Sequence, residues 1–361
     1  MKPKTFAGLA LLTFLMVVLA VIAVVLEDNT QTVLEDRKPA FPRLVERINE
    51  ATSIEIGSKD GKFTVTGGGD TWGVVEKNDY PVKRETVRDF LLSLANLRLV
   101  EAKTSRQDRY ERLEVEDIEA DDAESRSVTV RDGDGRILAD GIIGRRKYFL
   151  YVDGRGGTYL RRAGELQSWL AEGEMDFGAL PFDWLDRLAL EVPAEEVQEL
   201  TIAQPDSETL VLQKDEPGQE HFSVIGAPED GVLKTESEAD RLAFVVRNFE
   251  FDDVEPIEKV SFEDGPLHTA TYTTFDGLRI VIELASKEIV SLRIADNPPM
   301  ERWARIRAEV AEDAAEESRA AVTARADEIN ASTGAWAYKV DELMGNRLTK
   351  RRAQLYKEPD S

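Results

Sequence analysis

Histidine and cysteine, on which most nucleophilic and metal-dependent sites rely, are nearly absent from this sequence. It contains two histidines, His221 and His268, and no cysteine. Neither histidine has a second ligand at the helical spacing of a zinc site, and no Gly-x-Ser-x-Gly turn is present for a catalytic serine. We interpret both histidines as surface or strand-edge residues, and we predict no catalytic residue, no metal and no cofactor.

Carboxylates are the abundant reactive group, with 70 aspartates and glutamates against 46 lysines and arginines. Two carboxylates that face one cleft can hydrolyse a glycosidic bond, but only geometry can select such a pair among so many. The run Asp132-Gly133-Asp134-Gly135 lacks the third acid and the distal glutamate of an EF-hand loop, so we predict a hairpin turn. Gly67-Gly68-Gly69 lacks the ending of a phosphate-binding loop and also predicts a turn.

The net charge of -24 opposes binding to nucleic acid and to anionic lipid headgroups. Its main expected consequence is solubility, and docking onto a basic partner is the alternative. Lys350-Arg351-Arg352 is a solvated helix end, or else it pairs with acidic faces of the chain. The tryptophans are spread singly along the chain, which favours core packing over a stacking platform. We suspect only Trp303, on an otherwise charged segment, of touching a partner.

One apolar run organises the chain, and it extends from Phe6 to Leu26 without a charge or a proline. As a helix it would span roughly 32 Å, close to the ~30 Å hydrocarbon core of a bilayer. Lys2 and Lys4 precede the run, which predicts a cytoplasmic N-terminus and an exported remainder. A cleaved secretory signal is the alternative, but its apolar core usually has only about 7–15 residues. We therefore expect a single-pass protein of the inner (cytoplasmic) membrane, with its bulk periplasmic or extracytoplasmic.

The exported chain shows the same order of elements twice, which predicts a duplicated α+β unit. The corresponding elements are the strands at 54–56 and 200–202, those at 63–65 and 210–212, the helices at 87–97 and 242–249, and the hairpins at 127–143 and 269–284. We also expect a strand at 148–152, one helical turn at 166–170, and a long solvated helix at 300–330 that is rich in alanine, glutamate and arginine.

These patterns predict an α+β fold in which an N-terminal transmembrane helix is followed by two duplicated units with antiparallel sheets and packed helices. The expected parts are a cytoplasmic tail (1–5), the transmembrane helix (6–26), a tether (27–43), the first repeat (44–185), the second repeat (186–299), a charged helix insertion (300–331), and a strand and helix that complete the second repeat (332–361).

Several short motifs resemble the domain of unknown function 4340 family, whose members are bacterial single-pass membrane proteins. The motifs are Gly69-Asp70-Thr71-Trp72, Tyr80-Pro81-Val82, Ile143-Gly144 ahead of Tyr148-Phe149-Leu150-Tyr151-Val152, and Gly334-Ala335-Trp336-Ala337-Tyr338-Lys339. The resemblance implies no known activity and no catalytic residue. It implies association with ABC-type export systems similar to those implicated in gliding motility, which have a separate ATPase and permease.

The hypothesis that follows is a non-enzymatic, membrane-anchored accessory subunit of an envelope ABC-type transport complex. Its expected partners are the bilayer, through residues 6–26, and a membrane protein such as the permease or an auxiliary subunit; nucleic acid is not expected. Two alternatives stay open. One is a carboxylate-dependent envelope hydrolase acting on glycans, and the other is a structural or assembly protein that uses the charged helix as a scaffold arm.

Overall fold

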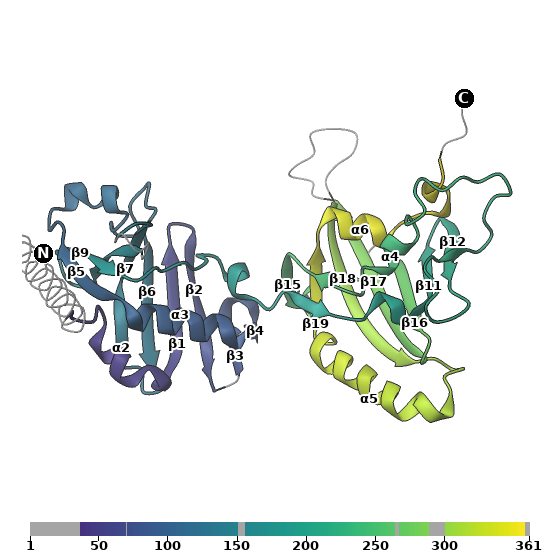
Figure 1. The fold of residues 1–361 in the computed structure, drawn as a ribbon, viewed down its shortest axis with the longest axis horizontal. Helices are drawn as coiled ribbons and strands as arrows, with labels where there is room; N and C mark the ends of the chain where they lie inside the picture. The colour runs from purple at the N-terminus through teal and green to yellow at the C-terminus, as the bar shows by residue number, and fades with distance from the viewer. Residues whose placement is uncertain (1–36, 70, 151–155, 264–266, 289–299, 358–361) are drawn as a thin grey trace, which may run out of the picture. The chain divides into compact units, whose positions relative to one another are not determined.

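Alternating apolar and polar residues build two antiparallel sheets, each with one face buried under helices and loops (Figure 1). The computed structural model describes residues 37–69, 71–150, 156–263, 267–288 and 300–357. The described chain forms two units: the first comprises residues 37–75 and 82–184, and the second comprises 76–81 and 185–357. The predicted α+β class with antiparallel sheets is confirmed.

The first unit has strands in the spatial order β3-β2-β1-β6-β7-β8-β9-β5. Their bounds are β1 (Ala51–Ser58), β2 (Gly61–Gly68), β3 (Thr71–Val74), β5 (Arg98–Ala102), β6 (Arg126–Asp132), β7 (Ile137–Lys147), β8 (Gly157–Arg162) and β9 (Ser168–Glu172). Its helices are α2 (Pro42–Arg47) and α3 (Arg84–Asn96), with short 3-10 turns at Ile48–Glu50, Gln107–Arg109, Glu111–Leu113 and Pro181–Trp184. In Figure 1, α3 crosses the strands of this sheet.

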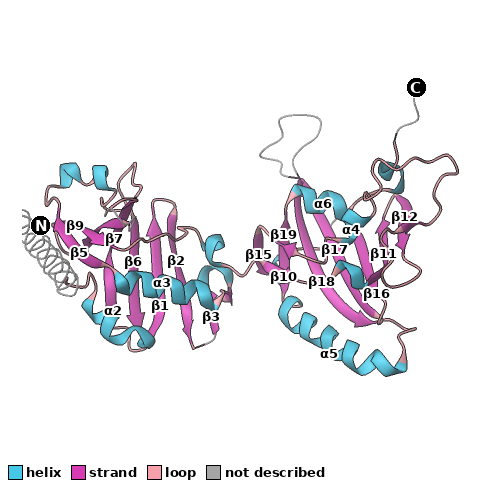
Figure 2. Cartoon of the chain, viewed as in Figure 1, coloured by secondary structure: helices cyan, strands magenta, loops and turns pink. Residues whose placement is uncertain are grey.

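The second unit has strands in the order β13-β12-β11-β16-β17-β18-β19-β15. Their bounds are β11 (Val197–Gln204), β12 (Ser207–Gln213), β13 (Ser223–Val224), β15 (Asp253–Pro256), β16 (Leu267–Thr274), β17 (Leu278–Glu288), β18 (Met300–Val310) and β19 (Trp336–Val340), and β10 (Leu188–Leu190) pairs separately with β14 (Phe249–Glu250). Its helices are α4 (Asp240–Ala243), α5 (Glu316–Thr333) and α6 (Glu342–Leu348) (Figure 2).

The two strand orders correspond element by element when each unit is followed along the chain. In both, the first three strands of the main sheet form one edge in reverse order, a helix follows, and the next strand of that sheet joins the opposite edge beside the last one. The hairpin turns at Asp60-Gly61 and Asp132–Gly135 lie where the sequence predicts them. Asp132 Oδ1 accepts hydrogen bonds from the backbone N–H groups of Asp134 and Arg136, so this carboxylate closes its own turn.

The predicted helix at 300–330 is wrong in its first third, because residues 300–310 form β18, which pairs with β17 along its whole length. The alternate residues Ala304, Ile306 and Ala308 in the middle of this strand are buried, and the charged residues between them lie on the other face. The composition favoured a helix, but pairing with β17 and burial of one face decided for a strand. Only α5 is an insertion, since the corresponding connection between β8 and β9 contains no helix.

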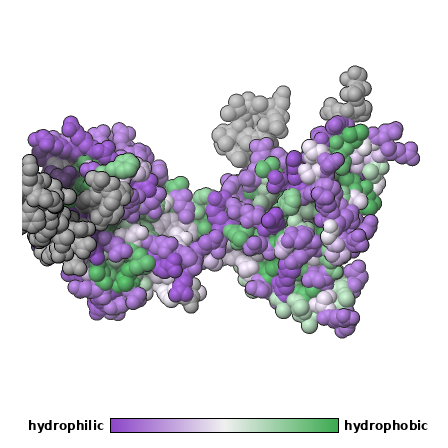
Figure 3. Space-filling model, in the orientation of Figure 1, coloured by the Kyte–Doolittle hydropathy of each residue, from purple (hydrophilic) through white to green (hydrophobic). Residues whose placement is uncertain are grey.

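The inserted helix α5 lies against the sheet. Asn330 accepts a hydrogen bond from Ala308 N at 2.8 Å and donates one to Ala308 O at 2.7 Å, so its side-chain amide occupies the edge of β18 as a peptide group would. Val322 and Ala326 are buried beneath the helix. Its remaining surface is mostly polar, like most of the face seen in Figure 3.

Three smaller predictions are also corrected. The helical turn at 166–170 is wrong, because Ser168–Glu172 forms β9 between β8 and β5. The helix at 242–249 shrinks to α4, and Phe249 instead begins β14. The strand at 148–152 is not seen at 148–150, and residues 151–152 lie outside the described residues. In the first two cases tertiary pairing overrode a short apolar pattern that periodicity alone could not assign.

The predicted membrane-spanning stretch, residues 6–26, lies outside the described residues. Within the described ranges, no helix is both long and apolar enough to cross a membrane.

The second unit also takes in a short segment from far upstream, residues 76–81, which includes β4 (Tyr80–Pro81). Tyr80 is buried, and its ring packs edge-on against Trp336, Phe251 and Tyr338 at centroid distances of 4.9, 5.3 and 6.4 Å. Burial raises the pKa of Tyr80 to about 12. Asp186 N donates a hydrogen bond to Pro81 O at 3.0 Å, which holds the segment at the start of this unit.

Candidate functional site

The first unit contains a cavity of 680 Å³ whose lining is rich in cations, although the chain as a whole is strongly acidic. The four cationic residues are Arg126, Arg145, Arg146 and Lys147. Three of them are consecutive at the end of β7, and Arg126 begins the adjacent strand β6. The cavity is therefore a local exception to the charge of the molecule.

Gly144 allows two backbones to meet at the cavity wall. The pairing of β7 with β8 shifts register between Ile143 and Arg146, as in a β-bulge. A Cβ atom on Gly144 would lie 2.3 Å from Leu113 O and 2.7 Å from Glu114 O, which is too close for any side chain. The segment 113–115 therefore packs directly on β7 and brings Glu114 to the cavity.

Arg161, on β8, holds that segment in place although it is itself buried. Its Nε donates to Val115 O at 2.9 Å, and its guanidinium pairs with Asp117 and lies 4.8 Å from the centre of the Tyr110 ring. A buried arginine that is satisfied on each side acts as a rigid clamp. The clamp fixes Glu114, whose backbone is left-handed at φ 57°.

Thr158 fixes the opposite wall of the cavity, which the segment Met175–Phe177 forms. Its hydroxyl donates to Gly173 O at 2.8 Å and accepts from Met175 N at 3.0 Å. Arg126 then reaches this segment from β6: its guanidinium donates to Phe177 O and lies 5.4 Å from the centre of the Phe177 ring. The wall is thus built by hydrogen bonds from two strands.

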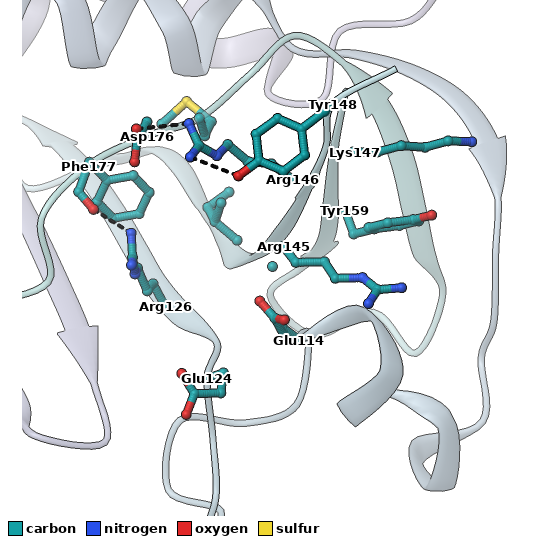
Figure 4. A pocket seen from close by; sticks show the side chains of 13 residues that line it. Glu114, Glu124, Arg126, Arg145, Arg146, Lys147, Tyr148, Tyr159, Asp176 and Phe177 are labelled. Carbon is teal, nitrogen blue, oxygen red and sulfur yellow. Dashed lines mark hydrogen bonds and ion pairs between the residues drawn. The ribbon is translucent and has the colours of Figure 1, made fainter. Parts of the chain in front are cut away.

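Two of the four cations are already engaged within the cavity (Figure 4). Arg126 is held by Phe177, and Arg146 lies between Asp176 Oδ2 at 2.8 Å and the Tyr148 hydroxyl at 3.3 Å. Arg145 and Lys147 differ, because no carboxylate of the described residues forms an ion pair with either.

Arg145 stacks on Tyr159 at 5.8 Å from the ring centre, and both extend to the same side of the view in Figure 4 as Lys147. These three side chains can therefore donate hydrogen bonds from one side to an incoming anion.

Acids form part of the lining as well. Burial raises the pKa of Glu114, and the nearby charges of Glu116 and Glu124 add to the rise, while Arg145 opposes it. Glu124 is mostly exposed and its Oε1 lies 3.0 Å from Lys59 Nζ. The cavity thus combines one partly desolvated carboxyl with a separate group of available cations.

The two histidines, interpreted from the sequence as surface or strand-edge residues, both belong to the second unit. His221 Nδ1 is 2.7 Å from Asp240 Oδ2, and Asp240 Oδ1 accepts a hydrogen bond from Phe222 N at 3.0 Å. His268 lies in β16 opposite Leu284. Among the described residues, no group of three or more acids and histidines is arranged to hold a metal ion.

The hydrogen bond that His221 makes to the Asp240 carboxylate raises the pKa of His221, whereas burial and the charges of Arg302 and Arg351 lower the pKa of His268. We therefore expect the two histidines to titrate on opposite sides of 6.5, the ordinary histidine value. Because the pKa of His221 is raised on folding, its stabilising contribution is complete below pH 6.5 and is lost as the pH rises through the raised value. NMR can follow both imidazoles, because the chain has only two histidines. The variant Asp240→Asn should return the pKa of His221, and not that of His268, toward 6.5. Equal titration of both histidines would contradict the geometry.

Two further residues or segments that the sequence singled out also lie in the second unit. Trp303 is on strand β18 and not on a helix, and it is half-buried opposite Ala285. The basic stretch 350–352 pairs with acids of its own unit: Lys350 Nζ is 3.1 Å from Glu238 Oε1, and Arg352 pairs with Glu208.

Sequence reasoning did not identify the cavity as a site. The available signal was the run Arg145-Arg146-Lys147-Tyr148-Phe149, which places three cations and two aromatic residues together in an acidic chain. From the sequence, the end of this run predicted only part of a strand. Arg126 is isolated in the sequence, and nothing around it indicated that it lies beside residues 145–147. Only the fold joins them.

Comparison with known proteins places the chain in a family. A model of the family described as "Domain of unknown function (DUF4340)" matches residues 72–268, just over half of the chain and the whole of the cavity lining. Neither the curated proteins nor the solved structures contain a match to the chain. The resemblance seen in the short motifs is confirmed, and the chain belongs to the DUF4340 family.

Proposed function

We propose that this protein is a non-enzymatic, membrane-anchored binding subunit of an ABC-type envelope transport complex, and that the first unit binds an anionic group in its cavity. In this proposal residues 6–26 form the anchor and both units are extracytoplasmic. The two units share one strand order, and we infer that they arose by duplication of a single binding module. The connection to a transport complex rests on family-level analogy.

The observation that carries the binding role is the pair Arg145 and Lys147. A chain with 70 acidic residues has ample means to neutralise surface cations, yet these two have no ion-pair partner among the described residues. They stand at a cavity whose other cations are bound to the walls. An arginine that stacks on a tyrosine ring, beside a lysine that likewise has no carboxylate partner among the described residues, is suited to recognise a phosphate or a carboxylate.

Crosslinking of the full-length, membrane-embedded protein, with partners identified by mass spectrometry, tests the complex. We expect an ATPase–permease pair or an auxiliary membrane subunit to be captured reproducibly. A chain that is recovered alone, under conditions in which a known complex of the same membrane is captured intact, would refute the accessory role.

A carboxylate-dependent hydrolase is the second candidate, because Glu114 and Glu124 line one cavity and the pKa of Glu114 is raised. Burial of a carboxyl is how glycosidases keep a general acid protonated. Against this role, Glu124 is solvated and paired with Lys59, so the site does not exclude water around both acids.

The variant Glu114→Gln distinguishes the two functions. If the cavity binds an anion, the variant should bind it at least as well as the parent chain, because a carboxyl that repels anions when ionised has been neutralised. If the cavity hydrolyses glycans, the same variant should lose hydrolysis by about 100-fold or more, as expected when a general acid is removed. Glu309→Gln, at an exposed glutamate of the second unit, serves as the charge-matched control.

A further inference from the structure

We propose that the anion bound by the cavity is the phosphate headgroup of a membrane lipid, and that Tyr148 and Phe149 enter the lipid interface beside it. This inference rests on the proposed anchoring and deepens the proposed binding role. It makes the end of β7 the membrane-contact element of the first unit. The element is defined here as residues 145–149.

Two neighbouring aromatic side chains of this element are largely exposed. Phe149 is 79 % exposed and Tyr148 is 60 % exposed, and among the exposed large hydrophobic residues of the described chain only these two are adjacent in sequence. Leaving a phenylalanine in water forfeits the free energy of burying it, so such a pair marks an interaction surface. Aromatic residues beside lysine and arginine are typical of segments that lie at the headgroup level of a bilayer.

The local charge complements an anionic headgroup even though the whole chain is acidic. Arg145, Lys147 and the Tyr159 hydroxyl offer donors on one side of the cavity, and the exposed aromatic pair follows Lys147 directly in the chain. At physiological salt, charges more than about 8 Å away are largely screened. The bilayer would therefore sense these cations rather than the net charge of -24, and repulsion of the acidic remainder would orient the first unit with this element toward the lipid.

The path of the chain keeps this element near the bilayer. Pro39 pairs with Arg98 on β5, and from there a continuous row of partners runs through Glu172 and Gly157 to Lys147. Three strand spacings of about 4.8 Å separate Arg98 from Lys147 along this row. Residues 27–36, which join the predicted anchor to the described chain, reach at most about 35 Å when fully extended. The proposed anchor and tether thus leave the element able to reach the headgroups.

The test uses the full-length chain in lipid nanodiscs, with a fluorophore that reports the polarity of its surroundings. Because the protein has no cysteine, Phe149→Cys provides a single labelling site without further changes. In discs that contain phosphatidylglycerol, we expect the label to shift to shorter wavelength and to be protected from an aqueous quencher. The same label at Leu166, 60 % exposed in the same unit, or at Leu343, 59 % exposed in the second, should remain in water.

Charge neutralisation separates headgroup recognition from simple proximity. Arg145→Gln combined with Lys147→Gln should lower the ratio of lipid-bound to free label about 30-fold in anionic discs, since each cation near an anionic membrane surface strengthens binding about fivefold. Lys62→Gln combined with Arg136→Gln removes the same charge from the same unit, but these cations are already paired with Glu119 and Asp134, so little change is expected. Unchanged hydrogen exchange of the first unit verifies that each variant is folded.

Three outcomes overturn the proposal. In the first, the Phe149 label stays in water in every disc. In the second, the label enters lipid to the same extent in the Arg145→Gln/Lys147→Gln variant as in the Lys62→Gln/Arg136→Gln variant. In the third, inorganic phosphate stabilises the first unit through Arg145 and Lys147 while the label stays in water, which would assign the site to a free anion. The partner-capture experiment is independent of these readouts. If a transport complex is captured while the Phe149 label stays in water, the proposed function stands and this inference is refuted. If no complex is captured but the label enters lipid, this inference stands and the accessory role is refuted.

Discussion

Replacing Gly144 by alanine is expected to destabilise the first unit by about 3 kcal/mol, at the upper end of the cost of overpacking a rigid site. The new methyl group would lie 2.3 Å from Leu113 O, and the obstructing atom belongs to a backbone rather than to a flexible side chain. The segment cannot retreat freely, because Arg161 holds Val115 O and Asp117 from the other side. Either β7 or the segment 113–117 must move.

Hydrogen exchange of the full-length protein checks this expectation, because it reports each unit separately. Protection should fall across β6, β7 and β8 and remain unchanged in β16, β17 and β18. Gly133→Ala is the matched control: Gly133 lies in the neighbouring hairpin turn, and a methyl group added there would have Thr52 Cγ2, at 3.9 Å, as its nearest neighbour. Binding at the cavity should weaken with Gly144→Ala and not with Gly133→Ala. Equal behaviour of the two variants would show that the close approach is not required.

Truncation of Tyr80 to alanine is expected to cost the second unit about 3–5 kcal/mol, the usual range for an aromatic residue removed from a core. The ring is buried and meets Trp336, Phe251 and Tyr338 in edge-to-face geometry, so truncation removes both its apolar burial and the aromatic contacts. Within the described part of the first 180 residues, only the segment 76–81 belongs to this unit. The cavity left behind has rigid walls and cannot collapse easily.

The conservative variant Tyr80→Phe keeps the ring and should cost less than about 1.5 kcal/mol, as volume-conserving changes in cores usually do. Hydrogen exchange should show the loss in β15 and β19, which pair with each other next to this ring. Loss of protection in β1 and β2 instead would mean that Tyr80 supports the first unit, and the assignment of residues 76–81 would fail.

The sequence predicted the strands with strict alternation and clear turns most successfully. Ile54–Ile56, Leu200–Ile202 and the hairpin at Asp132–Gly135 have only one reading, because their apolar residues repeat every second position between strong turn formers. The helix α3 was equally clear from its 3.6-residue spacing. Local pattern decides such elements before any tertiary contact forms.

Residues 300–310 show why other parts of the fold escaped prediction. Alanine, arginine and glutamate all favour helices, and alanine as the inward residue gives a weak alternation signal. The strand exists because β17 offers an unpaired edge along its full length, which no local property of 300–310 reveals. The strand β18 corresponds to β8 of the first unit, so a strand order for the second unit that was predicted from the first would have placed a strand at 300–310.

The cavity was not predicted from the sequence for a different reason. Its cations come from β6 and β7, its acid from the loop after Tyr110, and its far wall from residues beyond β9. Their convergence depends on Gly144, where the absence of a side chain is the signal, and on Arg161, whose burial cannot be read from its type. When a binding site is assembled from separated segments, its residues have no fixed spacing in the sequence by which the site could be recognised.

The membership of residues 76–81 in the second unit has a consequence for the order in which the chain acquires structure. During synthesis the chain emerges from its N-terminus, so Tyr80 leaves the ribosome more than a hundred residues before Phe251 and Tyr338, its core neighbours. The second half must therefore complete its folding on a segment presented by a first half that has already emerged. No single cut can divide this chain into two complete folding units, and a fragment that begins at Leu185 would lack one side chain of its own core.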